Sequence, residues 1–216
     1  MISRNTATNR WRLLFVLAPL FLTGCALPRV VITEDPLTAA EHGSLAAVYE
    51  SKGEYNLAEK EYTAALEGEP ESVAAAMGLG NLYLQRGAYG KAERVYKKAL
   101  KRAPDDGPLH NNLSWAYMGL GDLSRAERSV RRALEVDATR RHIYLDTIGV
   151  LHMRRGAYKA SEGSLLRALS GVGRDERGVS EIYTHLVELY TTWGKKAKAA
   201  TFAARLKAVT EEADHK

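Results

Sequence analysis

The sequence predicts an all-α fold, an α-solenoid of about five helix–turn–helix repeats in a right-handed superhelix. Three observations predict it. Small and large apolar residues recur with a period of 34 through most of the 216-residue chain. Within a period they fall at helical spacing on both sides of a glycine. A proline follows the second helix of the first two periods, at Pro70 and Pro104, where it stops the helix.

Each position of the repeat has a physical reason. In the unit at 73–106, Gly80 and Ala92 are small where two helices must approach closely, and Tyr96 fills the space beside them. Gly87 ends the first helix, since glycine accepts the left-handed conformation that closes a helix. A period of this length is typical of arrays of helix pairs. The recurring residues are Leu45, Leu79 and Leu113; Tyr49, Tyr83 and Tyr117; Gly53, Gly87 and Gly121; and Ala58, Ala92 and Ala126.

This pattern resembles the tetratricopeptide repeat, and the resemblance covers nearly all of the chain after residue 38. The fourth repeat fits with one extra residue near Arg141. The fifth is weaker, because it follows a longer junction at 170–178 and has Ala203 where an aromatic is usual. The lysine-rich last helix, at about 195–212, suits a cap with a solvated outer face. We expect the repeat domain at 39–213, with repeats at about 39–72, 73–106, 107–141, 142–175 and 180–213.

The amino-terminal residues have the organisation of an export signal. Arginines at 4, 10 and 12 precede an apolar run at 13–22, which is short for a membrane span. The stretch Leu22-Thr23-Gly24-Cys25 resembles the lipobox of bacterial lipoproteins, whose cysteine is acylated, for example with palmitate. The resemblance implies a signal peptide at 1–24, lipidation of Cys25 and a lipidated amino terminus with a tether at 25–38. An ordinary secretory signal and an uncleaved signal anchor are the alternatives.

The residue after the cysteine and the net charge bear on location and partners. In Gram-negative lipoproteins an aspartate there tends to retain the protein in the inner membrane, and this chain has Ala26. The resemblance implies a lipid anchor in the outer membrane, facing the periplasm, for a Gram-negative source; the inner membrane stays open. The three leader arginines account for three of the five net positive charges, which leaves +2. Nucleic acid is therefore not an expected partner.

The sequence contains no motif that is typical of a catalytic or metal site. The histidines lack the spacing of a helical zinc site, and neither a nucleophile elbow nor a phosphate-binding glycine loop occurs. His42 and His110 share one repeat position, which packing between repeats explains. We expect no catalytic residue, no metal, no cofactor and no small-molecule substrate.

In tetratricopeptide arrays the first helix of each pair lines a concave groove. A tryptophan and methionines there would suit an apolar or helical peptide, and Asn81 and Asn111 could bind its backbone. Trp115 and Met118 suit the core equally well. The expected groove residues, counted from the repeat leucines, are Met77, Asn81, Leu84, Gln85, Asn111, Trp115, Met118, Asp146, Val150, Met153, Arg154, Thr184 and Glu188.

The resemblance extends to pilotin-type tetratricopeptide lipoproteins, which help secretins assemble in type IV pilus systems, and to lipoproteins of other envelope-assembly machines. We expect a non-catalytic scaffold, anchored to the membrane in the periplasm, that binds a protein or peptide in its groove. Pilus, secretin or envelope-complex assembly is the expected pathway. The alternative is an accessory or regulatory subunit of an envelope enzyme such as a peptidase or glycan synthase.

Overall fold

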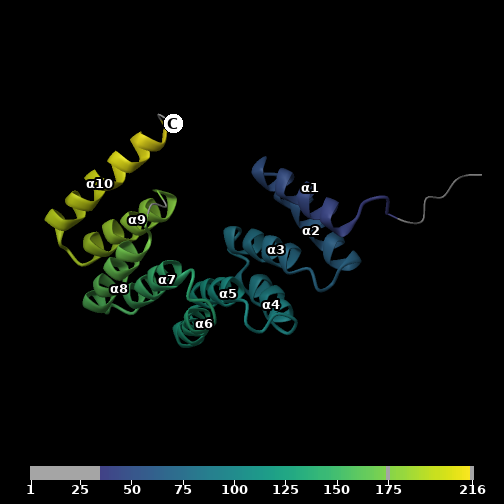
Figure 1. Cartoon of the computed structure of the whole chain (residues 1–216), viewed down its shortest axis with the longest axis horizontal. Coiled ribbons are helices and arrows are strands. Elements are labelled where there is room, and N and C mark those ends of the chain that lie inside the picture. Colours follow the sequence, from purple (N-terminus) through teal and green to yellow (C-terminus); the bar gives the residue numbers. More distant parts are fainter. Residues whose placement is uncertain (1–34, 174–175, 215–216) are drawn as a thin grey trace, which may run out of the picture. The chain divides into compact units, whose positions relative to one another are not determined.

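Helices make up the regular structure of this protein in a computed structural model that describes residues 35–173 and 176–214 (Figure 1). No strand occurs in these ranges. The expected signal peptide at 1–24 and the lipidation site at Cys25 lie outside them. The helices are α1 (Ala39–Ser51), α2 (Tyr55–Gly68), α3 (Val73–Gln85), α4 (Tyr89–Leu100), α5 (Gly107–Gly119), α6 (Leu123–Val136), α7 (Arg141–Arg154), α8 (Tyr158–Gly171), α9 (Glu176–Thr192) and α10 (Lys196–Asp214).

Successive helices pack as hairpins, and each hairpin packs against the next one along the chain. The odd-numbered helices α1, α3, α5, α7 and α9 also contact one another from hairpin to hairpin. In the described ranges the backbones of the even-numbered helices do not approach one another closely, and only long side chains join them. The odd-numbered helices therefore form an inner layer, and the even-numbered helices form an outer layer that spreads further apart. The predicted all-α solenoid of about five helix pairs is confirmed.

The two helices of a hairpin meet at a very small residue. A Cβ placed on Gly80 of α3 would lie 2.3 Å from Cε1 of the Tyr96 ring on α4. Tyr96 and Ala92 are fully buried, and the Tyr96 hydroxyl donates a hydrogen bond to Asn81 Oδ1 at 2.7 Å. In the fourth hairpin a Cβ on Gly149 would lie 2.5 Å from Cδ2 of Leu165. The missing side chain at these positions is what lets the paired helices bury their apolar faces.

The turn within each hairpin depends on a glycine in the left-handed conformation. Helix α3 ends at Gln85, and Gly87 follows with a φ of +69°. The amide of Ala88 then donates to the carbonyl of Tyr83 at 2.8 Å, which closes the helix end. The predicted helix stop at Gly87 is confirmed, and positive φ recurs at the equivalent positions Gly53, Gly121, Gly156 and Gly194.

The junction before the last hairpin is shorter than the predicted loop at 170–178. Helix α8 extends through Gly171, and α9 already begins at Glu176. Gly173 has a φ of +66°, a conformation that lets the chain turn sharply after the helix. The predicted loop was too long because Ser170 and Gly171 belong to helix α8.

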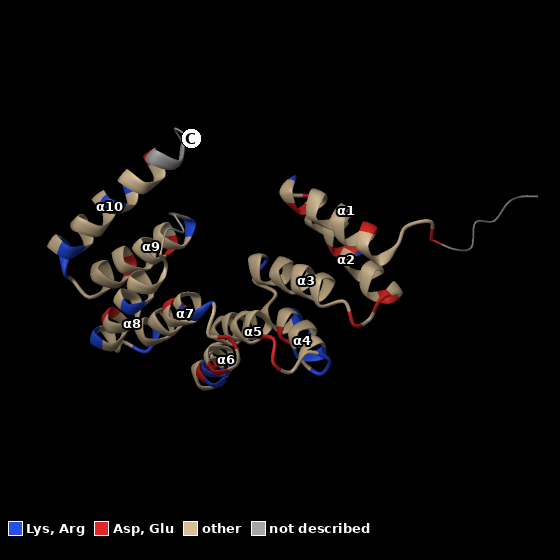
Figure 2. Cartoon of the chain, viewed as in Figure 1, with Lys and Arg blue, Asp and Glu red and all other residues tan. Residues whose placement is uncertain are grey.

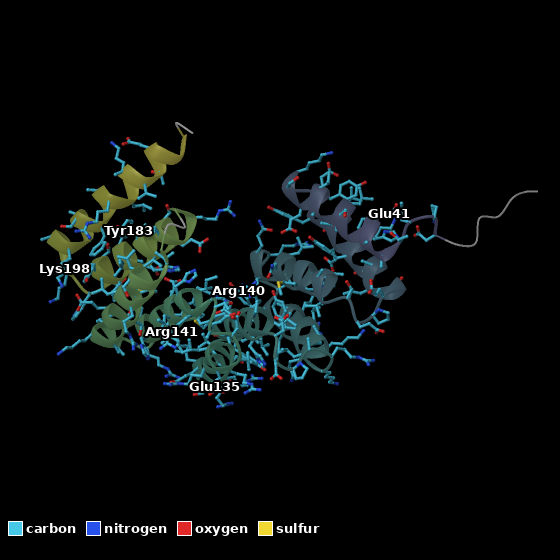
Figure 3. All side chains as sticks on the ribbon, viewed as in Figure 1. Glu41, Glu135, Arg140, Arg141, Tyr183 and Lys198 are labelled. Atoms are coloured by element: carbon cyan, nitrogen blue, oxygen red, sulfur yellow. The ribbon has the colours of Figure 1, made fainter. Side chains whose placement is uncertain are left out.

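An aromatic cluster packs the last repeat, which has Ala203 where an aromatic residue is usual. Phe202 is buried one position before Ala203 and stacks on Tyr190, with ring centroids 5.6 Å apart. Tyr183 of α9 lies 5.8 Å from the same ring, between α9 and α10 (Figure 3). The fifth helix pair is therefore packed by the same kind of residue as the others, from a shifted position.

A glutamate on the outer helices joins successive hairpins. Glu59 of α2 accepts hydrogen bonds from the Tyr83 hydroxyl at 2.8 Å and from Lys91 Nζ at 3.0 Å, both in the next hairpin. Glutamates recur at intervals of 34 or 35 residues, at 93, 127 and 162, on α4, α6 and α8. Their partners in the following hairpin are Arg125 for Glu93, Arg155 for Glu127, and Tyr190 with Lys198 for Glu162. We call Glu59, Glu93, Glu127 and Glu162 the glutamate ladder.

The ladder makes stability depend on pH. Burial by itself would raise the pKa of Glu59, but the hydrogen bonds from Lys91 and Tyr83 hold it below the ordinary glutamate value. The pKa values of Glu127 and Glu162 are lowered as well, chiefly by hydrogen bonds from arginine and lysine, respectively. A carboxyl whose pKa is depressed by folding contributes stability above its unfolded-state pKa, and this contribution is lost as the pH falls through its folded-state pKa.

Replacing Glu59 with glutamine should lower the free energy of unfolding at pH 7 by about 1 kcal/mol, since Tyr83 and Lys91 lose a charged acceptor. The loss should shrink as the pH falls below about 4.5, because Glu59 is then protonated in the unfolded chain and, at still lower pH, in the folded protein. Denaturant unfolding of the full chain at pH 7 and pH 3.5 measures both. Glu67→Gln, an exposed change on the same helix, is the matched control and should have little effect. Equal losses of unfolding free energy at both pH values would show that the charge of Glu59 does not stabilise the fold.

Gly80→Ala should destabilise the protein, because its methyl group would enter the buried Tyr96 ring. Gly43→Ala on α1 should instead stabilise it by about 0.5–1 kcal/mol, because alanine is the better helix former and nothing lies within 4 Å of the added carbon. Thermal unfolding of the full chain, followed by circular dichroism, compares the two. Changes of the same sign would show that the close approach at Gly80 does not limit packing.

Candidate functional site

An open pocket of about 370 Å³ lies on the inner layer, between α5, α7 and α9. Four of the residues expected in the groove meet there: Asn111 and Trp115 of α5, Asp146 of α7 and Thr184 of α9. Asn111 and Trp115 are four residues apart, so they share one helix face. The pocket is lined by Asn111, Trp115, Ile143, Asp146, Thr147, Glu181, Thr184 and His185, and we call it the inner pocket.

Two ionisable side chains are paired in the inner pocket. His185 Nδ1 lies 2.9 Å from Asp146 Oδ1, although the residues are 39 apart in sequence. The His185 ring also lies beside Trp115, with centroids 6.3 Å apart and planes tilted by 30°. Burial would lower the pKa of His185, but the Asp146 hydrogen bond and the charges of Asp146, Glu188 and Glu181 raise it above its ordinary value.

Asn111 has a polar atom without a partner. The residue is 6 % exposed, and its Oδ1 is buried with no hydrogen bond in the described part of the chain. A buried acceptor left unsatisfied costs about 1–3 kcal/mol. Oδ1 has almost no accessible surface, so a bound molecule would reach it only if the amide rotated about χ2 and turned this acceptor toward the inner pocket. A hydrogen-bond donor on that molecule would then remove the cost.

The inner layer differs from the outer layer in charge. Helices α3 and α5 contain no Lys, Arg, Asp or Glu, and they are tan throughout in Figure 2. The inner-layer helices on either side of this pair carry acidic groups: α1 has Glu41 and Glu50, and α7 and α9 place Asp146 and Glu181 in the pocket lining. Arg154, also on α7, donates from Nη1 to the carbonyl of Met118 at 3.2 Å and is not part of the lining. The inner pocket is thus rich in acceptors and negative charge.

Three expected groove residues lie in the core. Met118, Val150 and Met153 are 3 %, 3 % and 7 % exposed, respectively, and belong to the main apolar cluster. They therefore present little surface to a partner. The physical reason is that α5 and α7 are covered on this side by the hairpin that follows each of them. Trp115, in contrast, packs against the core but remains partly exposed at the pocket.

The other expected groove residues lie away from the inner pocket. Asn81 is exposed and accepts hydrogen bonds at Oδ1 from Tyr96 and from Asn112 Nδ2, the latter at 2.9 Å. Gln85 is exposed, and its Nε2 donates to the Tyr55 hydroxyl at 3.3 Å. Leu84 is half-buried against the core. These side chains mainly hold the inner surface of the second hairpin in place.

Sequence reasoning missed several residues of the pocket. Thr147 and His185 each directly follow an expected groove residue, Asp146 and Thr184 respectively, and the count from the repeat leucines did not extend to these neighbouring positions. Ile143 and Glu181 sit one turn earlier on α7 and α9. The available signal was the spacing 143, 146, 147 and 181, 184, 185, which marks one helix face in each case.

The described ranges show no group of three or more histidine, cysteine, aspartate or glutamate side chains that could hold a metal ion. In the same ranges no helix is both long and apolar enough to span a bilayer.

Two family models of the tetratricopeptide repeat match the sequence, over residues 44–107 and 83–145. They overlap and together cover the first three hairpins and the start of the fourth. A comparison with curated proteins gives no significant match.

Solved structures of tetratricopeptide proteins match the whole array. A repeat protein from Parabacteroides merdae is 24% identical with a TM-score of 0.69, and the alignment covers 81% of this chain and 66% of that one. A thermophilic protein from Thermus thermophilus is 23% identical with a TM-score of 0.69, covering 78% and 90%. PilW, described as a widely conserved type IV pilus biogenesis factor, is 20% identical with a TM-score of 0.69, covering 80% and 78%.

A further match, the pilF protein of Pseudomonas aeruginosa, is 18% identical with a TM-score of 0.61 and covers 84% of both chains. At these identities the structural likeness speaks for the fold alone. The family matches, the helix hairpins and the 34-residue period all indicate tetratricopeptide repeats. The chain is a tetratricopeptide-repeat protein, similar in fold to repeat proteins of type IV pilus biogenesis.

Proposed function

We propose that this protein is a non-catalytic scaffold that binds a segment of a partner protein on its inner layer. The observation that carries the proposal is the inner pocket, where Trp115 is partly exposed beside the unpartnered Oδ1 of Asn111. Tetratricopeptide arrays are in general interaction modules that present a continuous inner surface to a partner. Tryptophan is enriched among the residues that contribute most to binding, and such residues lie in well-packed pockets.

We further propose that a lipid on Cys25 anchors the scaffold to the outer membrane, on the periplasmic side. The basic residues, the apolar run at 13–22 and the Leu-Thr-Gly-Cys stretch at 22–25 support this. Each buried CH₂ of an acyl chain contributes about 0.8 kcal/mol, so a multiply acylated terminus would hold the protein stably. Assembly of a pilus or secretin complex is the pathway that we propose; PilW, which shares the fold, is described as a type IV pilus biogenesis factor.

Cys25→Ser should abolish labelling with a fatty-acid analogue and release the protein from the membrane fraction or leave its signal uncleaved. The serine hydroxyl is a much weaker nucleophile than the thiol that receives the lipid. Metabolic labelling and fractionation of cells that express the full chain test this. The lipoprotein proposal would fail if the variant were labelled, cleaved and membrane-bound like the wild type.

Trp115→Ala should weaken capture of the partner more than it weakens the fold. A buried aromatic anchor contributes about 2 kcal/mol or more to binding, which is a loss of about thirtyfold in affinity. The measurement is a pull-down from detergent-solubilised membranes with the full chain as bait, beside its melting temperature. An envelope enzyme recovered specifically would favour the accessory-subunit function over pilus assembly.

The control is Met118→Ala, three residues further along α5 and buried. It should lower the free energy of unfolding by about 2–5 kcal/mol through the cavity it leaves. At a temperature where the variant is folded it should still capture the partner. If Trp115→Ala retained full capture while Met118→Ala lost it, the inner pocket would not be the binding surface.

A further inference from the structure

The lining of the inner pocket offers acceptors and an aromatic face, but no lysine or arginine. The acceptors are the Oδ1 of Asn111, the carboxylate of Asp146 and the carboxylate of Glu181. Trp115 supplies the aromatic ring, and Ile143, which is 41% exposed, supplies an apolar surface. Such a set matches one chemical class of side chain, a long aliphatic stem that ends in a cation with several N–H donors.

We propose that the inner pocket binds a lysine or arginine side chain of the partner segment. This inference rests on the proposed function, since it names the residue type that the inner layer recognises. The aliphatic stem would lie on Ile143 and the ring of Trp115, and the charged end would donate to Asn111 and to the carboxylates. A cation over an indole ring and charge-assisted hydrogen bonds both strengthen when water is excluded.

Other side chains fit the pocket less well. An acidic side chain would face Asp146 and Glu181 and would bring no donor for Asn111. An apolar side chain would contact Trp115 but would bring no donor, so the cost of the unsatisfied Asn111 Oδ1 would remain. A basic side chain both neutralises the charge and supplies the donor.

His185 gives the pocket a dependence on pH. It shares Asp146 with the bound cation, and the charged groups that act on it are Asp146 of α7 and Glu181 and Glu188 of α9. From α5 it faces Trp115, which is uncharged. These acidic neighbours raise the pKa of His185 despite its burial. When protonated, His185 pairs with Asp146 and repels a cation, so a basic side chain should bind more tightly at pH 8 than at pH 5.5.

The test uses arrayed short peptides in matched sets that differ only at one central residue, which is lysine, arginine, norleucine or glutamate. The full chain in detergent is applied at pH 8 and at pH 5.5. The lysine and arginine members should bind about fivefold more tightly than the norleucine member, with the glutamate member weakest. The preference should be smaller at pH 5.5. Norleucine binding as well as lysine, or no preference in any set, would overturn the proposal.

Two variants link the preference to the pocket. Asn111→Leu should lose most of the preference with a melting temperature unchanged or raised, because Asn111 Oδ1 makes no hydrogen bond that the fold would lose. Glu181→Gln, an exposed change, should reduce the preference about twofold through the lost charge. Asn56→Leu, at an exposed position of the outer helix α2, is the matched control and should leave it unchanged. A preference that survived in Asn111→Leu would place the basic side chain elsewhere.

The outcomes also separate this inference from the proposed function. If the pull-down captures a partner through Trp115 while the peptide sets favour norleucine, the scaffold function holds and the basic-residue inference fails. If the sets favour lysine or arginine but no membrane protein is captured, the pocket chemistry holds and the scaffold function fails.

Discussion

The close approach of two helices at a residue with almost no side chain is the constraint on which this structure depends. At Gly80 the Tyr96 ring occupies the space of the absent Cβ, and at Gly149 Leu165 does the same. A hairpin so narrow buries only part of its apolar surface, and the rest must be covered by the next hairpin. The array therefore follows from the hairpin: helices in a tight pair need neighbours on both sides, and one repeat cannot be stable alone.

Two layers with different tasks result from this packing. The outer helices carry the glutamate ladder, in which a carboxylate of one hairpin accepts hydrogen bonds from the next, as Glu59 does from Tyr83 and Lys91. The inner helices contact one another directly and are poor in charge along α3 and α5. Stability of the array is thus reinforced on the outer side. On the inner side, the Oδ1 of Asn111 makes no such hydrogen bond in the described part of the chain.

The inner pocket lies where the neutral part of the inner layer meets the acidic part. Asn111 and Trp115 come from an uncharged helix, whereas Asp146, Glu181 and His185 come from the two helices that follow. An apolar and aromatic surface beside a fixed negative charge recognises an amphipathic cation better than either feature alone, because the stem and the charged end are bound together. The Asp146–His185 pair holds that charge in place in the absence of a ligand and makes it sensitive to pH.

The sequence by itself determined the repeat, because each requirement of a hairpin is local: a glycine at 87 to end a helix, a small residue at 80 or 92, an aromatic at 96. These recur every 34 residues and can be recognised without knowledge of the neighbours. The sequence also predicted that Asn111, Trp115 and Asp146 face the inner side of the array, and all three line the inner pocket. Only the tertiary structure decided that Trp115 stays at the surface while Met118, three residues later on the same helix, is 3 % exposed. It likewise brought His185 to Asp146 across 39 residues and left the Oδ1 of Asn111 without a partner. The reason is physical: the exposure and the pairing of a side chain depend on how much of its helix the next hairpin covers. The sequence of a single repeat does not contain that information.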